Sequence, residues 1–227
     1  SFKESDLKYG GPSGTHIRFI NAVAREIEKW RRNTLPDKTF KIAAFAYNAV
    51  KKAPVIMDDK TGQYVPVDES LIMEDNTALM LAPLDACALH DITAPCNKNV
   101  YERLKGWTVL CKTLLIWDYH TYFNNYFIYM PSIRAYKNNI ALYKKSGAHL
   151  CYAEGNCSDR SPGFQDLKLY LLSKLMWNCQ ADTDTLIYEF MKYYYKGSAE
   201  YMKLYLLKLE KHYESLEVLY SKLGARG

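Results

Sequence analysis

The sequence contains no long apolar run and no concentration of positive charge. None of its apolar stretches approaches the roughly 18–20 residues that a membrane-spanning helix needs, so no transmembrane segment is expected. The 227 residues carry a net charge of +5, with basic residues spread beside acidic ones. Because nucleic-acid binding gathers Lys and Arg on one surface, no nucleic-acid partner is expected. A signal peptide is also lacking, and we expect the chain to begin inside a longer precursor.

Most short motifs of metal, nucleotide and nucleophile sites are missing as well. The six cysteines include no CxxC pair, and the histidines show neither HxH nor HExxH spacing. GxSxG and GxxxxGK(S/T) are also absent. The sequence therefore predicts no metal, no cofactor, no nucleophile elbow and no P-loop.

The positions of four cysteines indicate what these residues do. Cys111 and Cys151 lie in or beside apolar runs of strand type, which favours buried thiols. Cys87 and Cys96 flank one loop and could form a disulfide, although spacing alone does not establish pairing. A protease dyad of Cys87 and His90 is disfavoured, because no third group is placed to orient the histidine.

Short apolar runs alternate with helical patterns along the chain. Runs of this length and type are typical of buried parallel strands, and the alternation predicts an α/β fold with a parallel sheet. The predicted strands are residues 41–47, 77–84, 114–117 and 150–153. The predicted helices are residues 15–30, 97–106, 132–145, 164–177, 183–195 and 199–223, with Asp182 or Thr183 as N-cap of the fifth.

Four strands with outer helices correspond to the C-terminal half of a (β/α)8 barrel. We expect residues 1–182 to form this part of the barrel, with a hairpin insertion at about 54–76, and residues 183–227 to add C-terminal helices packed on it. Since a half barrel would leave an open sheet edge, the upstream half of the same barrel is an expected partner. The alternative is an open sheet capped by the last three helices. Helical segments contain Trp107, Trp177 and Tyr193 to Tyr195, which favours core packing for all of them.

Polar and aromatic residues follow the predicted strands, at the edge where α/β folds bind ligands. Two carboxylates beside aromatic rings are the equipment of glycoside hydrolysis, in which one acid protonates the leaving oxygen and the other acts as base or nucleophile. We assign the catalytic role to Glu154 and Asp118, while noting that acids at strand ends also serve as helix caps. The candidate substrate-binding residues are Tyr47, Asp85, His90, Trp117, Tyr119, His120 and Asn156.

Strand geometry separates Asp118 from its aromatic neighbours. Alternate residues of a strand point to opposite faces, so Trp117 and Tyr119 cannot share the face of Asp118. If Asp118 points into the barrel, the two rings pack outward against helices. Asp118 is then better suited to bind a sugar hydroxyl or to orient the acid, and Glu154 becomes the better candidate for a direct chemical role.

An ordered series of segments stands out in this sequence: residues 87–90, 96–99, 115–119 with Phe123, 130–133, 169–178 and 194–199. Together these segments resemble one large bacterial family, first catalogued as a domain of unknown function and grouped in part as glycoside hydrolase family 163. The resemblance covers about residues 11–209 and implies a (β/α)8-type barrel. It also implies an endo-β-N-acetylglucosaminidase-like glycosidase that acts on N-glycans of glycoproteins, outside the cytoplasm of gut bacteria.

Two other functions remain open from the sequence. One is a non-catalytic glycan-binding module with the same aromatic residues but no working acid pair. The other is a helical interaction module built on the last three helices, whose apolar stripe predicts docking to another surface.

Overall fold

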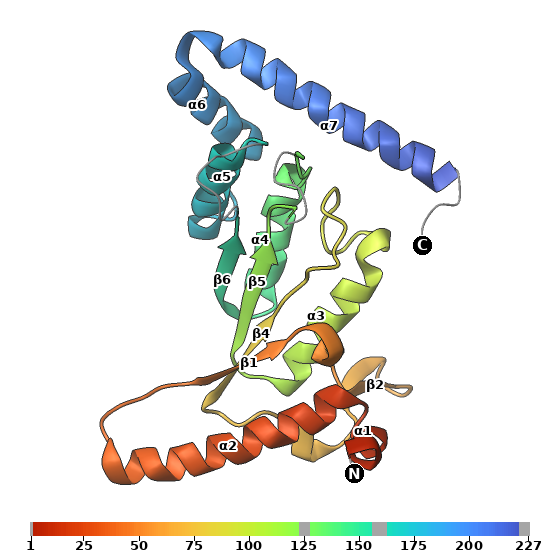
Figure 1. Ribbon diagram of the computed structural model, residues 1–227, viewed down its shortest axis with the longest axis vertical. Helices are drawn as coiled ribbons and strands as arrows, with labels where there is room; N and C mark the ends of the chain where they lie inside the picture. Colours follow the sequence, from red (N-terminus) through yellow and green to blue (C-terminus); the bar gives the residue numbers. More distant parts are fainter. Residues whose placement is uncertain (1, 123–127, 156–162, 223–227) are drawn as a thin grey trace. The chain divides into compact units, whose positions relative to one another are not determined.

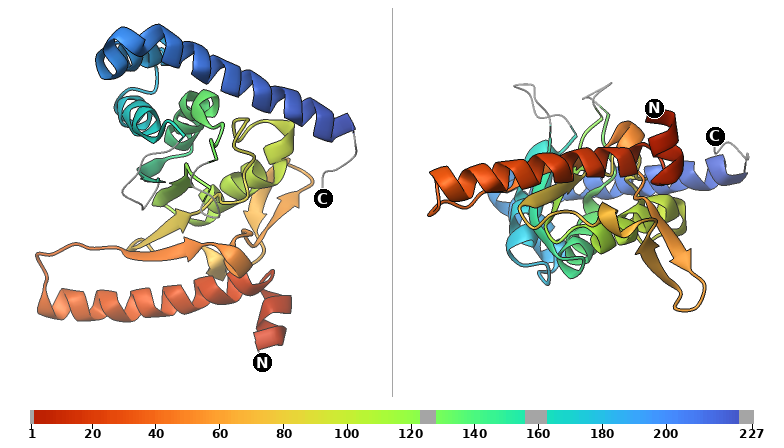
Figure 2. Two further views of the ribbon diagram at one scale, coloured as in Figure 1. Left: turned by 45° about the horizontal axis from the view of Figure 1, so that its top comes forward. Right: turned by 90° about the horizontal axis from the view of Figure 1, so that it is seen from below.

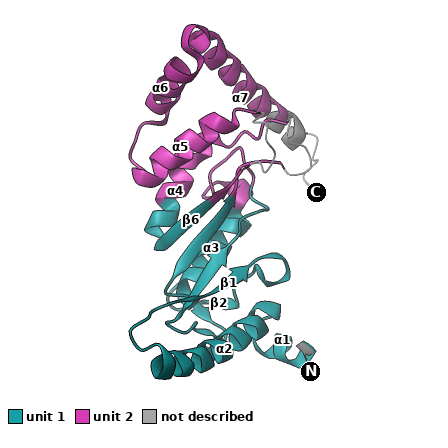
Figure 3. Cartoon of the chain, turned by 60° about the vertical axis from the view of Figure 1, so that its left-hand side comes forward, with its two compact units in different colours: residues 1–86, 98–118, 142–152 teal, residues 87–97, 119–141, 153–227 magenta. Residues whose placement is uncertain are grey.

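The computed structural model describes residues 2–122, 128–155 and 163–222 (Figure 1). The chain divides into two compact units, coloured separately in Figure 3. Unit 1 comprises residues 1–86, 98–118 and 142–152, and unit 2 comprises residues 87–97, 119–141 and 153–227.

A four-stranded, mostly parallel sheet forms the centre of unit 1. Its strands are β1 (Ile42–Ala46), β4 (Thr77–Leu81), β5 (Leu114–Tyr119) and β6 (Ala148–Glu154), in the order β1-β4-β5-β6. β1 pairs in parallel with β4, and β4 pairs in parallel with β5. The predicted α/β class with a parallel sheet is therefore confirmed. All four strands overlap apolar runs that the sequence marks as strands. Only β4 is buried along most of its length, whereas β6 has no buried residue.

Helices and a small hairpin complete unit 1. The helices are α1 (Phe2–Lys8), α2 (Pro12–Thr34) and α3 (Lys98–Leu110), and the hairpin pairs β2 (Val55–Asp58) with β3 (Gln63–Pro66). Gly62 has a φ of 65°, a left-handed conformation that glycine adopts without strain, and this closes the hairpin turn. Trp107 of α3 is buried, as predicted, and its indole N–H donates to the Lys51 carbonyl at 2.9 Å.

Unit 2 contains a helical layer built from α5 (Gln165–Trp177), α6 (Thr183–Tyr195) and α7 (Ala199–Lys222). Leu167, Leu171 and Ile187 are among the buried residues of its core. The Asp182 side chain accepts from the Thr185 N–H at 2.8 Å, which confirms the predicted cap of α6. Figure 2 shows α6 and α7 folding back on each other.

The prediction of core packing is wrong for Trp177, and also for Tyr193 and Tyr194, which expose 71% and 53% of their surfaces. Trp177 is the last residue of α5, and 93% of its surface is exposed. Cys179, two residues further along the chain, is buried in the core of unit 2.

The remaining elements of the described residues are the helix α4 and short 3-10 turns. α4 (Tyr136–Lys145) supplies residues to both units. None of the helices within the described ranges is both long enough and apolar enough to cross a bilayer. The 3-10 turns are η1 (Asn48–Val50), η2 (Glu69–Leu71), η3 (Pro95–Asn97), η4 (Ile133–Ala135) and η5 (Lys196–Ser198).

Candidate functional site

Three aromatic rings form a row across the sheet of unit 1. The ring centroids of Phe45 and Trp117 are 5.5 Å apart, and those of Trp117 and Tyr152 are 4.7 Å apart. Phe45 and Tyr152 expose 44% and 48% of their surfaces, and Trp117 is half-buried. We call Phe45, Trp117 and Tyr152 the aromatic row.

The register of the sheet explains why Phe45 and Trp117 lie on the same face. Phe45 is the partner of Met80, which in turn is the partner of Leu115. Trp117 lies two residues beyond Leu115, so it shares that face of the sheet. Each ring of the aromatic row lies in the second half of its strand, near the carboxyl end, where parallel sheets bind ligands.

Asp118 lies on the opposite face, against α4. The Tyr143 hydroxyl donates to Asp118 Oδ2 at 2.7 Å, and Tyr143 is buried. Burial, together with the nearby carboxylate, raises the pKa of Tyr143 well above its usual value. The alternation of Asp118 and Trp117 is as predicted, but the ring of Trp117 lies beside other rings of the sheet, whereas Asp118 faces the helix.

Asp85 belongs to an ion-pair cluster at a cleft of about 420 Å³ beside the hairpin. Its carboxylate accepts two hydrogen bonds from Arg103, one of them at 2.9 Å, and one from Lys51 at 2.9 Å. Burial alone would raise the pKa of Asp85, but the bonds from these two cations hold it well below its usual range. Tyr47, the other candidate in this unit, immediately precedes η1.

His90 lies between two thiols in unit 2. Its Nδ1 is 3.7 Å from Cys87 Sγ and 3.4 Å from Cys96 Sγ. Cys87 and Cys96 are separate thiols, not a disulfide. The sulfur and nitrogen atoms of the three residues all lie within 4.8 Å of one another. The sequence did not predict this cluster, because its cysteines and histidines show neither CxxC nor HxH spacing.

His120 and Glu154 are joined through the backbone in unit 2. The His120 N–H donates to the Glu154 carbonyl at 2.9 Å. His120 is buried, with its ring 4.9 Å from that of Tyr136 in an edge contact. Tyr119 and Glu154 are half-buried. Asn156 lies outside the described residues.

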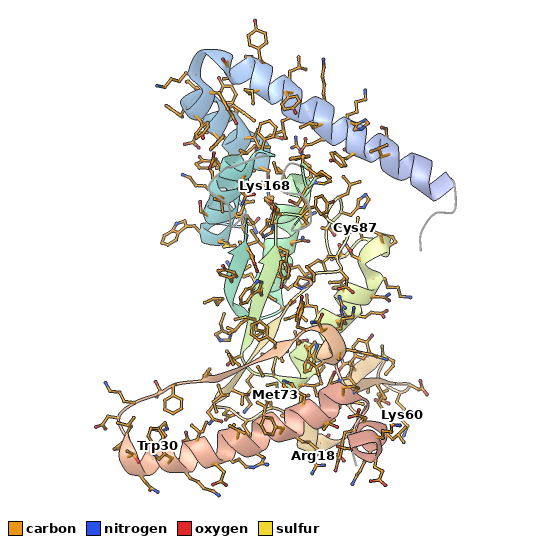
Figure 4. All side chains as sticks on the ribbon, in the orientation of Figure 1. Arg18, Trp30, Lys60, Met73, Cys87 and Lys168 are labelled. Carbon is orange, nitrogen blue, oxygen red and sulfur yellow. The ribbon has the colours of Figure 1, made fainter. Side chains whose placement is uncertain are left out.

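The sequence analysis missed Lys168 of α5, which Figure 4 labels. Only 2% of its surface is exposed, its Nζ donates to the His120 carbonyl at 3.2 Å, and burial lowers its pKa to about 7. Its Nζ also lies 5.1 Å from the centre of the Tyr129 ring. Helical spacing offered the signal, because Lys168 lies three residues before Leu171 and four before Leu172, both buried.

Cys111 and Cys151, which the sequence predicts to be buried thiols, are each only half-buried. Burial raises the pKa of each thiol to about 12, so both stay protonated at neutral pH.

Comparison with known proteins gives a single family. The model of the family described as "Domain of unknown function (DUF4838)" matches residues 1–207. No curated protein and no solved structure matches the chain.

Proposed function

Since the chain belongs to this DUF4838 family, whose description names no activity, we propose from its own residues that it is a glycoside hydrolase-like domain acting on complex glycans. The proposed activity is that of an endo-β-N-acetylglucosaminidase on the N-glycans of glycoproteins. In this proposal the sheet of unit 1 is part of a (β/α)8-type barrel completed by upstream residues, and the protein works outside the cytoplasm.

The aromatic row is the observation that carries the proposal. Two of its rings are nearly half exposed although they lie on the central sheet, where a purely structural aromatic residue would be covered. An aromatic face presents apolar surface to the apolar face of a sugar ring. Three rings in contact, near the carboxyl ends of their strands, suit a chain of sugars better than a single small ligand.

Glu154 is the proposed acid. It ends β6, at the strand edge where parallel α/β folds hold catalytic side chains. Asp118 is a weaker candidate than the sequence suggested, because its carboxylate is engaged by Tyr143 on the helix-covered face. We therefore propose that Asp118 supports β5 and α4, and that a second acid comes from elsewhere in the full protein.

Replacing Trp117 tests the glycan-binding part of the proposal. Trp117→Ala is expected to raise the Kd for an N-glycan oligosaccharide about tenfold, because an aromatic contact contributes roughly 0.5–1.5 kcal/mol. Trp117→Phe should retain most of the affinity. The measurement is isothermal titration calorimetry on the full protein, with circular dichroism of each variant.

Trp177→Ala is the matched control, since Trp177 is exposed and lies on a helix of the other unit. It should bind the oligosaccharide with unchanged affinity. Equal affinities of Trp117→Ala and Trp177→Ala would remove the aromatic row from the proposal.

Replacing Glu154 tests the hydrolytic part. Glu154→Gln is expected to slow the release of oligosaccharide from a glycoprotein at least about 100-fold, the lower end of the range for a positioned acid or base. Asp118→Asn is the comparison and should leave the rate per folded molecule unchanged. A wild-type protein that binds the glycan but never cleaves it would favour the second candidate, a non-catalytic glycan-binding module, which the aromatic row supports equally well.

A further inference from the structure

The loop that follows β4 brings two thiols to one imidazole nitrogen, as described above for Cys87, His90 and Cys96. Cys87 and His90 are half-buried, and Cys96 is exposed. We propose that these three residues bind a soft divalent metal ion, with zinc as the best match. This inference does not depend on the proposed glycan chemistry.

The distances between the ligand atoms fit a tetrahedral zinc ion. With Zn–S of about 2.3 Å and Zn–N of about 2.0–2.1 Å, sulfur and nitrogen atoms on one tetrahedral ion lie roughly 3.6 Å apart. The two Sγ–Nδ1 distances of 3.7 and 3.4 Å bracket that value. Thiolate and imidazole are also the ligands that select zinc over magnesium or calcium.

Thiol–imidazole hydrogen bonds explain the geometry less well. In a neutral imidazole, Nδ1 has either one lone pair to accept with or one proton to donate. It can therefore make one good bond to a thiol, whereas two sulfur atoms approach the same Nδ1 of His90 here. A metal ion satisfies all three atoms at once.

The loop is held in shape by Asn97, which is 1% exposed. Its Oδ1 accepts from the Cys87 N–H at 2.6 Å. Its Nδ2 donates to the carbonyls of Cys87, His90 and Asp91, at 3.1, 3.2 and 2.9 Å. A single buried amide thus fixes the backbone at two of the three proposed ligands.

Residues of α4 anchor the same loop within unit 2. The Ile92 N–H donates to Asn139 Oδ1 at 2.8 Å, and Asn138 Nδ2 donates to Asp91 Oδ2 at 2.9 Å. A backbone ordered in advance lowers the entropy lost when a metal binds. Asp91 is occupied by these bonds and by Thr93, so we assign the fourth position on the metal to a water molecule.

Cobalt(II) titration tests the site, because cobalt(II) replaces zinc and absorbs light when thiolates bind it. Full protein, reduced and stripped with a chelator, is expected to bind one cobalt(II) ion per chain with thiolate charge-transfer absorption, and one equivalent of zinc should displace it. Cys87→Ser and Cys96→Ser should each weaken zinc binding at least about 100-fold. Even the loss of a residue that only hydrogen-bonds to a metal ligand can cost up to about 100-fold in metal affinity. His90→Gln is a third variant of the proposed site. It removes the imidazole ligand while keeping a side chain of similar shape.

Cys111→Ser is the matched control, since this thiol lies in unit 1 and stays protonated at neutral pH. It should bind zinc like the wild type, which would show that thiol number alone does not set affinity. Absence of the charge-transfer band in reduced wild-type protein of native circular dichroism would overturn the proposal. Equal zinc affinities of wild type and Cys87→Ser would overturn it as well.

Discussion

Lys168→Met is expected to raise the free energy of unfolding at pH 7 by about 2–4 kcal/mol, and to lose most of that gain near pH 10. Lys168 is buried, and burial lowers its pKa from 10.5 to about 7. At about 1.36 kcal/mol per pKa unit, a shift of this size corresponds to roughly 5 kcal/mol of destabilisation when the amine is charged. Loss of the hydrogen bond to the His120 carbonyl offsets part of the gain.

The pH window follows from the two pKa values of Lys168. Between about pH 7 and pH 10.5 the unfolded chain holds a proton on this amine that the folded protein lacks, so wild-type stability increases with pH across that range. Below about pH 7 both states are protonated, and the full penalty applies. Methionine has no such proton, so the difference between the two proteins should be largest at pH 7 and below.

Urea unfolding of wild type and Lys168→Met at pH 6.5, 8 and 9.5 measures this difference. Lys174→Met, at an exposed position of the same helix, is the matched control and should change the free energy of unfolding little. A stability difference between wild type and Lys168→Met that is equal at pH 6.5 and 9.5 would mean that Lys168 titrates near its ordinary pKa.

Apolar patterning sufficed to predict the sheet but not which of its faces is covered. The runs that became β1, β4, β5 and β6 are apolar because both faces of a parallel strand are usually buried. The same rule of alternation correctly placed Asp118 and Trp117 on opposite faces. Which face receives α4 depends on the path of the chain between β5 and β6, and no local pattern encodes that path.

Contacts distant in sequence account for the other differences. Trp177 looked like a core residue because its helix is largely apolar, yet it lies at the end of α5 with 93% of its surface exposed. Lys168 is buried because it lies on the same face of α5 as Leu171, Leu172 and Leu175, all of which are buried, and this reverses the usual preference of lysine for solvent. The grouping of Cys87, His90 and Cys96 depends on the side chain of Asn97, whose role only the folded loop reveals. The barrel itself stays a prediction.

The second large effect is expected at Arg134, which joins three elements of unit 2. Arg134 Nε and Nη2 donate to the Glu210 carboxylate of α7 at 2.9–3.1 Å, and its Nη1 bonds to Asp184 in the first turn of α6. Glu210 is 8% exposed, and its pKa is raised by burial despite the opposing effect of Arg134. Arg134→Met would leave a buried carboxylate without its cation, which costs about 3–5 kcal/mol in other proteins. We expect the lower end here, since 38% of the Arg134 side chain is exposed.

Two comparisons make the Arg134 prediction specific. Arg32→Met removes an exposed partner of Glu28 on α2, and the loss of a surface pair of this kind should change the stability little. The double variant Arg134→Met/Glu210→Leu should recover most of the stability lost in Arg134→Met, because no charge then remains buried. The loss in Arg134→Met should also shrink as the pH falls through the raised pKa of Glu210, because protonation neutralises the carboxylate in the folded state. Urea unfolding at pH 7 and pH 5 measures all three effects, and equal losses for Arg134→Met and Arg32→Met would show that Glu210 is solvated rather than buried.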